Sequence, residues 1–195
     1  YEGEIKFDNV SYSYPNQDSD AIENISFKIG KGERIGLVGR VGSGKTTVGK
    51  LITKLFLPQK GSISIDGIDI RQLDPSEIRE NIGYVAQEPW LIAGTIEQNI
   101  SLGATDIKSE EIIEAAEIST ATEFINKHTK GFKQVLSERG EGLSGGQKQA
   151  LTVARALVQK PPIFIFDEPT SSMDAKTEKK FIENFKRYNP EATLL

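Results

Sequence analysis

One stretch of the chain restricts its fold more than any other. Residues 39–46 read Gly-Arg-Val-Gly-Ser-Gly-Lys-Thr, which matches the pattern G-x-x-x-x-G-K-[ST]. The apolar segment from Arg34 to Val38 before this stretch predicts a strand. The residues after it predict a helix, because four apolar side chains fall at the i, i+3, i+4 and i+7 spacing of one helical face. These side chains are Val48, Leu51, Ile52 and Leu55. The sequence therefore predicts a strand, a glycine-rich loop and a helix in succession.

The chemistry of this loop is that of an anion site. Its glycines let the backbone curl so that successive N–H groups point at one anion, and the following helix adds the positive end of its dipole. Lys45 supplies a positive charge to terminal phosphates, Thr46 offers a hydroxyl to Mg²⁺, and Thr47 offers one to a nearer phosphate. A glycine-rich turn without a ligand is the alternative, and the flanking strand and helix argue against it. The candidate phosphate-binding residues are Gly39, Gly42, Ser43, Gly44, Lys45, Thr46 and Thr47.

Two neighbouring carboxylates follow an apolar segment later in the chain. Residues 163–166 are all apolar, which predicts a strand buried on both faces. Asp167 closes this strand, so we expect its carboxylate at the carboxyl edge of the sheet beside the phosphate loop, where a Mg²⁺ ligand belongs. Glu168 comes next and is a candidate for orienting or deprotonating an attacking water. Two solvated turn charges are the alternative.

A second anion site is predicted where another helix begins. The segment Leu143 to Gln147 opens this helix, and Ser144 together with the N–H groups of Gly145 and Gly146 forms a second place for a phosphate. Taken alone, Ser144 is better explained as a helix cap than as a phosphate ligand. The helix buries one face, which comprises Ala150, Val153, Ala154 and Leu157.

The order of the remaining elements predicts the fold class. Partial alternation in residues 5–14 indicates an N-terminal strand, and two glycine-containing turns, at 30–32 and 66–67, indicate hairpins. The first hairpin would join Ile25–Ile29 to Arg34–Val38. Residues 82–86 predict another strand, whereas residues from about 88 to 143 show only helical patterns. We therefore predict an α/β, P-loop NTPase fold with a mainly parallel core sheet, an N-terminal antiparallel β-subdomain and an inserted α-helical subdomain.

Two helices carry clear capping signals. Asp74 precedes a short helix with Pro75 at its first position. Asp174 precedes the last helix, whose inward side chains are predicted to be Phe181, Ile182, Phe185 and Tyr188.

Composition excludes several classes of protein. The formal net charge is −4, with 24 Lys plus Arg against 28 Asp plus Glu, and no basic stripe suits nucleic acid. The chain contains no cysteine, so disulfides and cysteine-ligated metals are excluded. Its apolar stretches are far shorter than the ~20 residues that span a bilayer. We expect residues 1–195 to be one domain of something longer, truncated at the C-terminus.

These motifs, in this order, resemble those of the nucleotide-binding domain of ABC transporters, and the resemblance covers essentially the whole chain. By this resemblance, Lys45 and Thr46 lie in the Walker A motif, Gln87 in the Q-loop, and residues 143–147 in the signature motif. Asp167 corresponds to the Walker B aspartate, Glu168 to the catalytic glutamate, and residues 172–174, which include Asp174, to the D-loop.

The resemblance implies a head-to-tail dimer of two such domains, expected to be identical, with ATP and Mg²⁺ held between the phosphate loop of one and the signature of the other. Nucleotide would contact the phosphate-loop residues, Tyr14, Ser144, Gly145, Gly146, Gln147 and Asp174. Thr46, Gln87 and Asp167 would hold the metal, and Glu168, Gln87 and Lys45 would be catalytic. Tyr14 would stack on adenine, although a packed tyrosine, like Tyr12 two residues earlier, is the alternative.

The subclass implied is an exporter. Residues 137–142 and 94–96 resemble exporter segments, and residues 39–45, 69–75 and 171–174 are most similar to the ATPases of bacterial type I secretion. The implied function is ATP-driven export of a protein or peptide, with transmembrane domains as partners, at the cytoplasmic face of the bacterial inner membrane. A soluble ABC ATPase acting on DNA or ribosomes is the alternative.

Two further residues carry expectations from the resemblance. The family's switch histidine is missing, because the only histidine, His128, lies upstream of the signature, so weak turnover is expected of residues 1–195. Trp90 suits either a groove for a membrane-domain helix or packing under the helical insertion.

Overall fold

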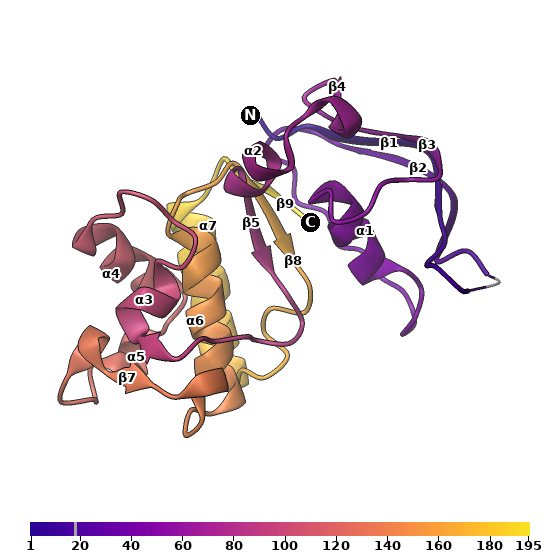
Figure 1. The fold of residues 1–195 in the computed structure, drawn as a ribbon. Helices are drawn as coiled ribbons and strands as arrows, with labels where there is room; N and C mark the ends of the chain where they lie inside the picture. Colours follow the sequence, from indigo (N-terminus) through magenta and orange to yellow (C-terminus); the bar gives the residue numbers. More distant parts are fainter. Residues whose placement is uncertain (18) are drawn as a thin grey trace. The chain divides into compact units, whose positions relative to one another are not determined.

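The computed structural model describes residues 1–17 and 19–195, which form two compact units (Figure 1). Unit 1 consists of Tyr1–Ile82, Pro161–Asp167 and Glu191–Leu195. Unit 2 consists of Gly83–Lys160 and Glu168–Pro190. Unit 2 contains the predicted helical subdomain, about residues 88–143, and extends beyond it, so the boundaries of that subdomain stay a prediction.

Unit 1 begins with a four-stranded antiparallel sheet in the order β2-β1-β3-β4. Ile5 of the central strand lies opposite Ile29 on one side and Ile65 on the other, and all three are buried. The predicted antiparallel start and the hairpin at Asp66-Gly67 are confirmed. The strands are β1 (Ile5–Tyr12), β2 (Ile22–Ile29), β3 (Lys60–Ile65) and β4 (Ile68–Asp69).

The hairpin predicted around residues 30–32 is wrong. β2 pairs with β1, whereas Arg34 makes an isolated parallel bridge with Leu194, where the Ile35 N–H donates to the Leu194 carbonyl at 2.8 Å. The neighbouring strand β9 covers only Thr193–Leu194, so the ladder does not continue past Ile35. Val38 is 99% exposed. An apolar run forms a strand only where a neighbouring strand supplies its backbone partners.

The helix predicted after the glycine-rich loop is confirmed but is shorter than its apolar pattern. α1 (Lys45–Ile52) buries Val48, Leu51 and Ile52. Leu55 lies beyond its end and is 53% exposed, so including Leu55 in the stripe was wrong. The other helices of unit 1 are η1 (Ile70–Gln72) and α2 (Pro75–Glu80).

The predicted aspartate cap and the apolar strand of unit 1 are also confirmed. The Ser76 N–H donates to the Asp74 carboxylate at the start of α2, at 2.7 Å. β8 (Ile163–Phe166) buries its first three residues and pairs in parallel with β9 (Thr193–Leu194).

Unit 2 is mainly helical (Figure 1). α3 and α4 pack against α6, and α4 also packs against α7. Two-residue strands β6 and β7 pair antiparallel, and the sequence did not predict them because alternation has no meaning over two residues. The elements are β5 (Ile82–Val85, whose first residue belongs to unit 1), β6 (Gly94–Thr95), α3 (Ile96–Ile100), α4 (Ser109–Ile118), α5 (Thr122–Ile125), η2 (Gly131–Lys133), β7 (Val135–Leu136), η3 (Glu138–Gly140), α6 (Gly145–Leu157) and α7 (Ala175–Tyr188).

The two long helices of unit 2 begin at their predicted caps, Ser144 and Asp174. The predicted buried face of α6 is confirmed. In α7, Phe181 and Phe185 are buried, but Ile182 is 40% exposed and Tyr188 is 46% exposed, so their inward placement was wrong. Ile182 lies about 100° around the helix from Phe181, and Tyr188 is the last helical residue. Among the described residues, no helix combines the length and apolar character needed to cross a bilayer.

Candidate active site

The glycine-rich loop in unit 1 has the conformation that its sequence requires. Gly42 and Gly44 have φ of 81° and 89°, which residues with a side chain rarely adopt. A Cβ on Gly44 would also lie 2.5 Å from the Ala21 carbonyl oxygen. α1 begins directly after this loop, so the free N–H groups of its first turn face the loop's concave side. This arrangement is an anion-binding geometry.

Lys45 places its charge over the same loop. Its ammonium donates to the carbonyl oxygens of Gly39, at 2.9 Å, and Arg40, at 3.1 Å. Phosphate oxygens are stronger acceptors for an ammonium than these neutral carbonyls, because the bond is then assisted by charge on both partners. The Lys45 charge is therefore available to an incoming phosphate.

The structure brings two of the predicted metal ligands together in unit 1. The Thr46 hydroxyl donates to the Asp167 carboxylate at 2.5 Å, although 121 residues separate them in the chain. Asp167 follows β8 directly, as predicted. A hydroxyl and a carboxylate are hard oxygen donors, and Mg²⁺ is commonly held by only one or two protein ligands together with water and phosphate. The donor set therefore fits Mg²⁺.

Tyr14, the predicted adenine-stacking residue, and Tyr12, two residues earlier, differ in burial. Tyr12 is 5% exposed and packs on Phe56, with ring centroids 5.3 Å apart. Tyr14 is half-buried, and its hydroxyl lies 3.1 Å from that of Thr47. Tyr12 is thus a packed residue. The Tyr14 ring makes edge contacts with Tyr12 and Phe56, with centroids 5.2 Å and 5.5 Å apart, and its stacking on adenine stays a prediction. Thr47 is buried and already engaged with Tyr14, and its contact with a phosphate stays a prediction.

In unit 2, the predicted catalytic glutamate is bonded to the predicted Q-loop residue. The Gln87 amide nitrogen donates to a Glu168 carboxylate oxygen at 3.1 Å, and both residues are exposed. This bond leaves the Gln87 amide oxygen available to a metal or a water. Glu168 has a left-handed backbone with φ of 51°, a strained conformation for a residue with a side chain. Because Asp167 and Glu168 are consecutive, their Cα atoms are about 3.8 Å apart.

The second predicted anion site is a complete helix cap. The Ser144 hydroxyl accepts from the Gln147 N–H at 3.2 Å, and the Gln147 side chain accepts from the Ser144 N–H at 2.9 Å. A Cβ on Gly146 would lie 2.9 Å from the Ser172 carbonyl oxygen, and one on Gly145 would lie 3.1 Å from the Ser172 Cβ. Both signature glycines are thus needed for the close approach of Ser172, a packing role that the sequence did not predict.

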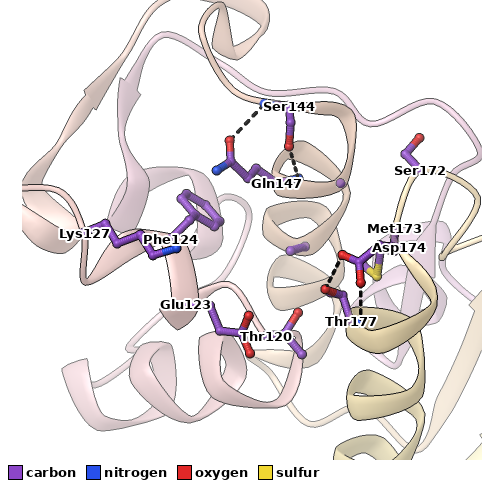
Figure 2. A pocket seen from close by; sticks show the side chains of 12 residues that line it. Thr120, Glu123, Phe124, Lys127, Ser144, Gln147, Ser172, Met173, Asp174 and Thr177 are labelled. Carbon is purple, nitrogen blue, oxygen red and sulfur yellow. Dashed lines mark hydrogen bonds between the residues drawn. The ribbon is translucent and has the colours of Figure 1, made fainter.

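A pocket of about 350 Å³ lies beside this cap within unit 2 (Figure 2). Figure 2 shows Ser144 and Gln147 at the start of α6, with Asp174 and Thr177 at the start of α7. The Asp174 carboxylate accepts from the Thr177 hydroxyl at 2.7 Å and from two backbone N–H groups. These bonds, the Thr177 hydroxyl first, lower the pKa of Asp174. Asp174 acts here as a helix cap, and its contact with nucleotide stays a prediction.

Two polar residues of α6, one buried and one half-buried, were missed by sequence reasoning. Gln149 is 0% exposed and bonds to the segment that follows Glu168. Arg155 donates to the carbonyl oxygens of Asn99, at 2.7 Å, and Trp90, at 2.9 Å, and burial lowers its pKa. The sequence signal that could have identified them is a polar side chain on the apolar face of a predicted helix.

Trp90 and His128 are the two remaining residues that carried expectations from the sequence. The Trp90 side chain is 60% exposed, so the packed alternative is wrong. His128 makes an edge contact with Phe124 in the helical region, with ring centroids 6.2 Å apart.

Comparison with known proteins adds three findings. A family model described as ABC transporter matches residues 22–171. The chain is 41% identical over 194 residues to the alpha-hemolysin translocation ATP-binding protein HlyB of Escherichia coli O157:H7, covering 100% of this chain and 28% of HlyB. It is 43% identical over 195 residues to the mitochondrial potassium channel ATP-binding subunit of Rattus norvegicus, covering 99% of this chain and 27% of that protein.

A solved structure is also similar. A bacterial Atm1-family ABC exporter with ATP bound matches with a TM-score of 0.94 and 34% identity, covering 99% of this chain and 34% of the exporter chain. The chain thus spans 27% to 34% of the length of these three relatives.

Proposed function

Because the chain belongs to the ABC transporter family, we propose that it binds Mg·ATP and hydrolyses it to power export of a protein or peptide across a membrane. The observation that carries this proposal is the pairing of Thr46 with Asp167 beside the curled glycine loop. The match to HlyB, a translocation ATP-binding protein, supports the exporter subclass and a polypeptide cargo.

The residues of unit 1 hold the phosphates. The loop N–H groups and the start of α1 accept the anionic tail, and Lys45 exchanges its bonds with the Gly39 and Arg40 carbonyls for bonds with phosphate oxygens. Thr46 and Asp167 hold Mg²⁺, which supplies positive charge against the phosphate oxygens. Tyr14 presents its ring to adenine.

The residues of unit 2 act on water. The Glu168 carboxylate accepts a proton from the water that attacks the terminal phosphate, and the bond from Gln87 holds this carboxylate in place. General-base assistance of this kind contributes about 10²–10⁴ in rate. Ser144 and the glycines after it receive the phosphate tail bound by a second domain, so two copies close head to tail around two ATP molecules.

The remaining parts of the proposal concern the surroundings of the chain. Transmembrane domains of the same transporter are the mechanical partners, and the exposed Trp90 suits a contact with them. The domain acts at the cytoplasmic face of a bacterial inner membrane.

The proposal is tested on the full-length protein by measuring nucleotide affinity and hydrolysis together. Lys45→Ala should abolish Mg·ATP binding in calorimetry, whereas Glu168→Gln should retain binding and lower kcat by about 10²-fold or more. Binding unaffected by Lys45→Ala would show that the loop does not hold the phosphates. Hydrolysis that persists without any membrane partner but responds to DNA or ribosomes would instead support a soluble ABC ATPase.

A further inference from the structure

The buried amide of Gln149 connects the helix that carries the signature to the segment that begins at Glu168. Its nitrogen donates to the Glu168 carbonyl oxygen and to the Ser171 hydroxyl, both at 3.0 Å. Its oxygen accepts from the Ser172 N–H at 2.9 Å. We propose that Gln149 is a positioning residue for Glu168, an inference that rests on the proposed role of Glu168 in hydrolysis.

The three bonds use both N–H donors of the Gln149 amide and one of the two lone pairs of its oxygen. Gln149 is 0% exposed, so water cannot replace its contacts, and a buried carbonyl or N–H left without a partner is strongly disfavoured. A side-chain carboxamide can donate twice and accept from a single planar group, which a hydroxyl, a carboxylate or an ammonium cannot do. The amide therefore fixes one carbonyl, one hydroxyl and one N–H in a defined arrangement.

The backbone of Glu168 needs such support. Its φ of 51° lies in the left-handed region, which persists only when surrounding contacts hold it. Gln149 holds the Glu168 carbonyl and Gln87 holds the Glu168 carboxylate, so the residue is bonded at both its main chain and its side chain. Loss of the Gln149 bonds would let the peptide after Glu168 rotate and would carry the carboxylate out of position.

The same contacts tie Glu168 to the signature. Ser144 caps α6, and Gln149 lies about one and a half turns further along this helix. Gly145 and Gly146 allow Ser172 to approach α6 closely enough for its N–H to reach the Gln149 amide. A shift of the α6 N-terminus therefore moves the Glu168–Ser172 segment with it.

The test compares variants of the full-length protein by ATP hydrolysis and thermal unfolding. Gln149→Met keeps the side-chain length but removes all three bonds. We expect it to lower kcat by about 10-fold to 100-fold, with KM for Mg·ATP changed by less than about twofold, because phosphate binding belongs to other residues. In a Glu168→Gln background, Gln149→Met should cause no further loss, because both changes disable the same group.

Thr152→Val is the matched control. Thr152 is a buried polar residue of the same helix, and its hydroxyl donates only to the Gln149 backbone carbonyl within α6. The Thr152→Val variant should have a lower unfolding temperature than the parent protein and an unchanged kcat. If Gln149→Met does not fold, Ser171→Ala takes its place, because it removes one of the three bonds. It should lower kcat by a smaller factor, and it should not lower kcat further in the Glu168→Gln background.

Three results would overturn the inference. The first is a kcat for Gln149→Met within about twofold of the parent protein. The second is a loss of kcat from Gln149→Met that is as large in the Glu168→Gln background as in the parent protein. The third is a loss of kcat for Thr152→Val as large as that for Gln149→Met. The proposed function itself would be refuted if the parent protein did not hydrolyse ATP, or if Lys45→Ala left its affinity for Mg·ATP unchanged. Both measurements are made before any Gln149 variant is tested, so the two failures are distinguishable.

Discussion

Gly44→Ala should destabilise the protein more than Gly42→Ala, although both glycines have nearly the same backbone conformation. Their φ values are 89° and 81°, so an alanine at either position costs about 1–2 kcal/mol from left-handed strain. The surroundings differ. A Cβ on Gly44 would lie 2.5 Å from the Ala21 carbonyl oxygen and 3.2 Å from the Ile22 side chain, whereas nothing lies within 4 Å of a Cβ on Gly42.

The difference between the two variants isolates the clash. Forcing an extra methyl into a filled space costs typically about 1–3 kcal/mol. For a chain of this size, about 1 kcal/mol shifts the unfolding midpoint by roughly 2–4 °C. The midpoint of Gly44→Ala should therefore lie at least about 2–4 °C below that of Gly42→Ala in thermal unfolding without nucleotide. Equal midpoints would refute the argument that the loop is packed against Ala21.

Two further predictions concern unit 2. Because the hydrogen bonds led by the Thr177 hydroxyl lower the pKa of Asp174 below its ordinary 3.8, its contribution to stability is complete above that pH and is lost as the pH falls through the lowered pKa. Asp174→Asn should flatten the loss of stability in acid, measured by urea unfolding across that range, and an unchanged acid profile would contradict the assignment. Arg155→Lys should lower the free energy of unfolding by about 2 kcal/mol, because one ammonium cannot replace a fork that bonds to Asn99 and Trp90. The exposed Arg187→Lys is its control, and equal effects of both changes would count against the buried fork.

The sequence predicted those features that depend on neighbours along the chain. The caps Asp74, Ser144 and Asp174 are such features, since each cap bonds to N–H groups two or three residues ahead. The glycines of the loop are another, since glycine has no Cβ and can adopt a positive φ without strain. The approach of Thr46 to Asp167 was also predicted, because parallel topology brings loop and strand end to one edge of a sheet.

The features that the sequence did not predict depend on partners far along the chain. Residues 34–38 have the composition of a strand, but only Arg34 and Ile35 find a neighbour in Leu194. Gln149 has no motif because its partners are mainly backbone groups, which every residue possesses. The sequence does not show whether a glycine is required by a turn or by a close neighbour. At Gly146 it is required by a close neighbour, Ser172.

Helix α6 unites these observations. Its apolar face packs against α3 and α4, and two of its polar side chains, the buried Gln149 and the half-buried Arg155, bond outward to different segments. Gln149 holds the chain that follows Glu168, and Arg155 holds the Asn99 and Trp90 carbonyls near the exposed tryptophan. Because both side chains extend from one continuous helix, α6 links the segment that begins at Glu168 to the Asn99 and Trp90 backbone. The element that presents Ser144 is therefore mechanically connected to the proposed catalytic carboxylate and to the proposed membrane-domain contact within the same unit.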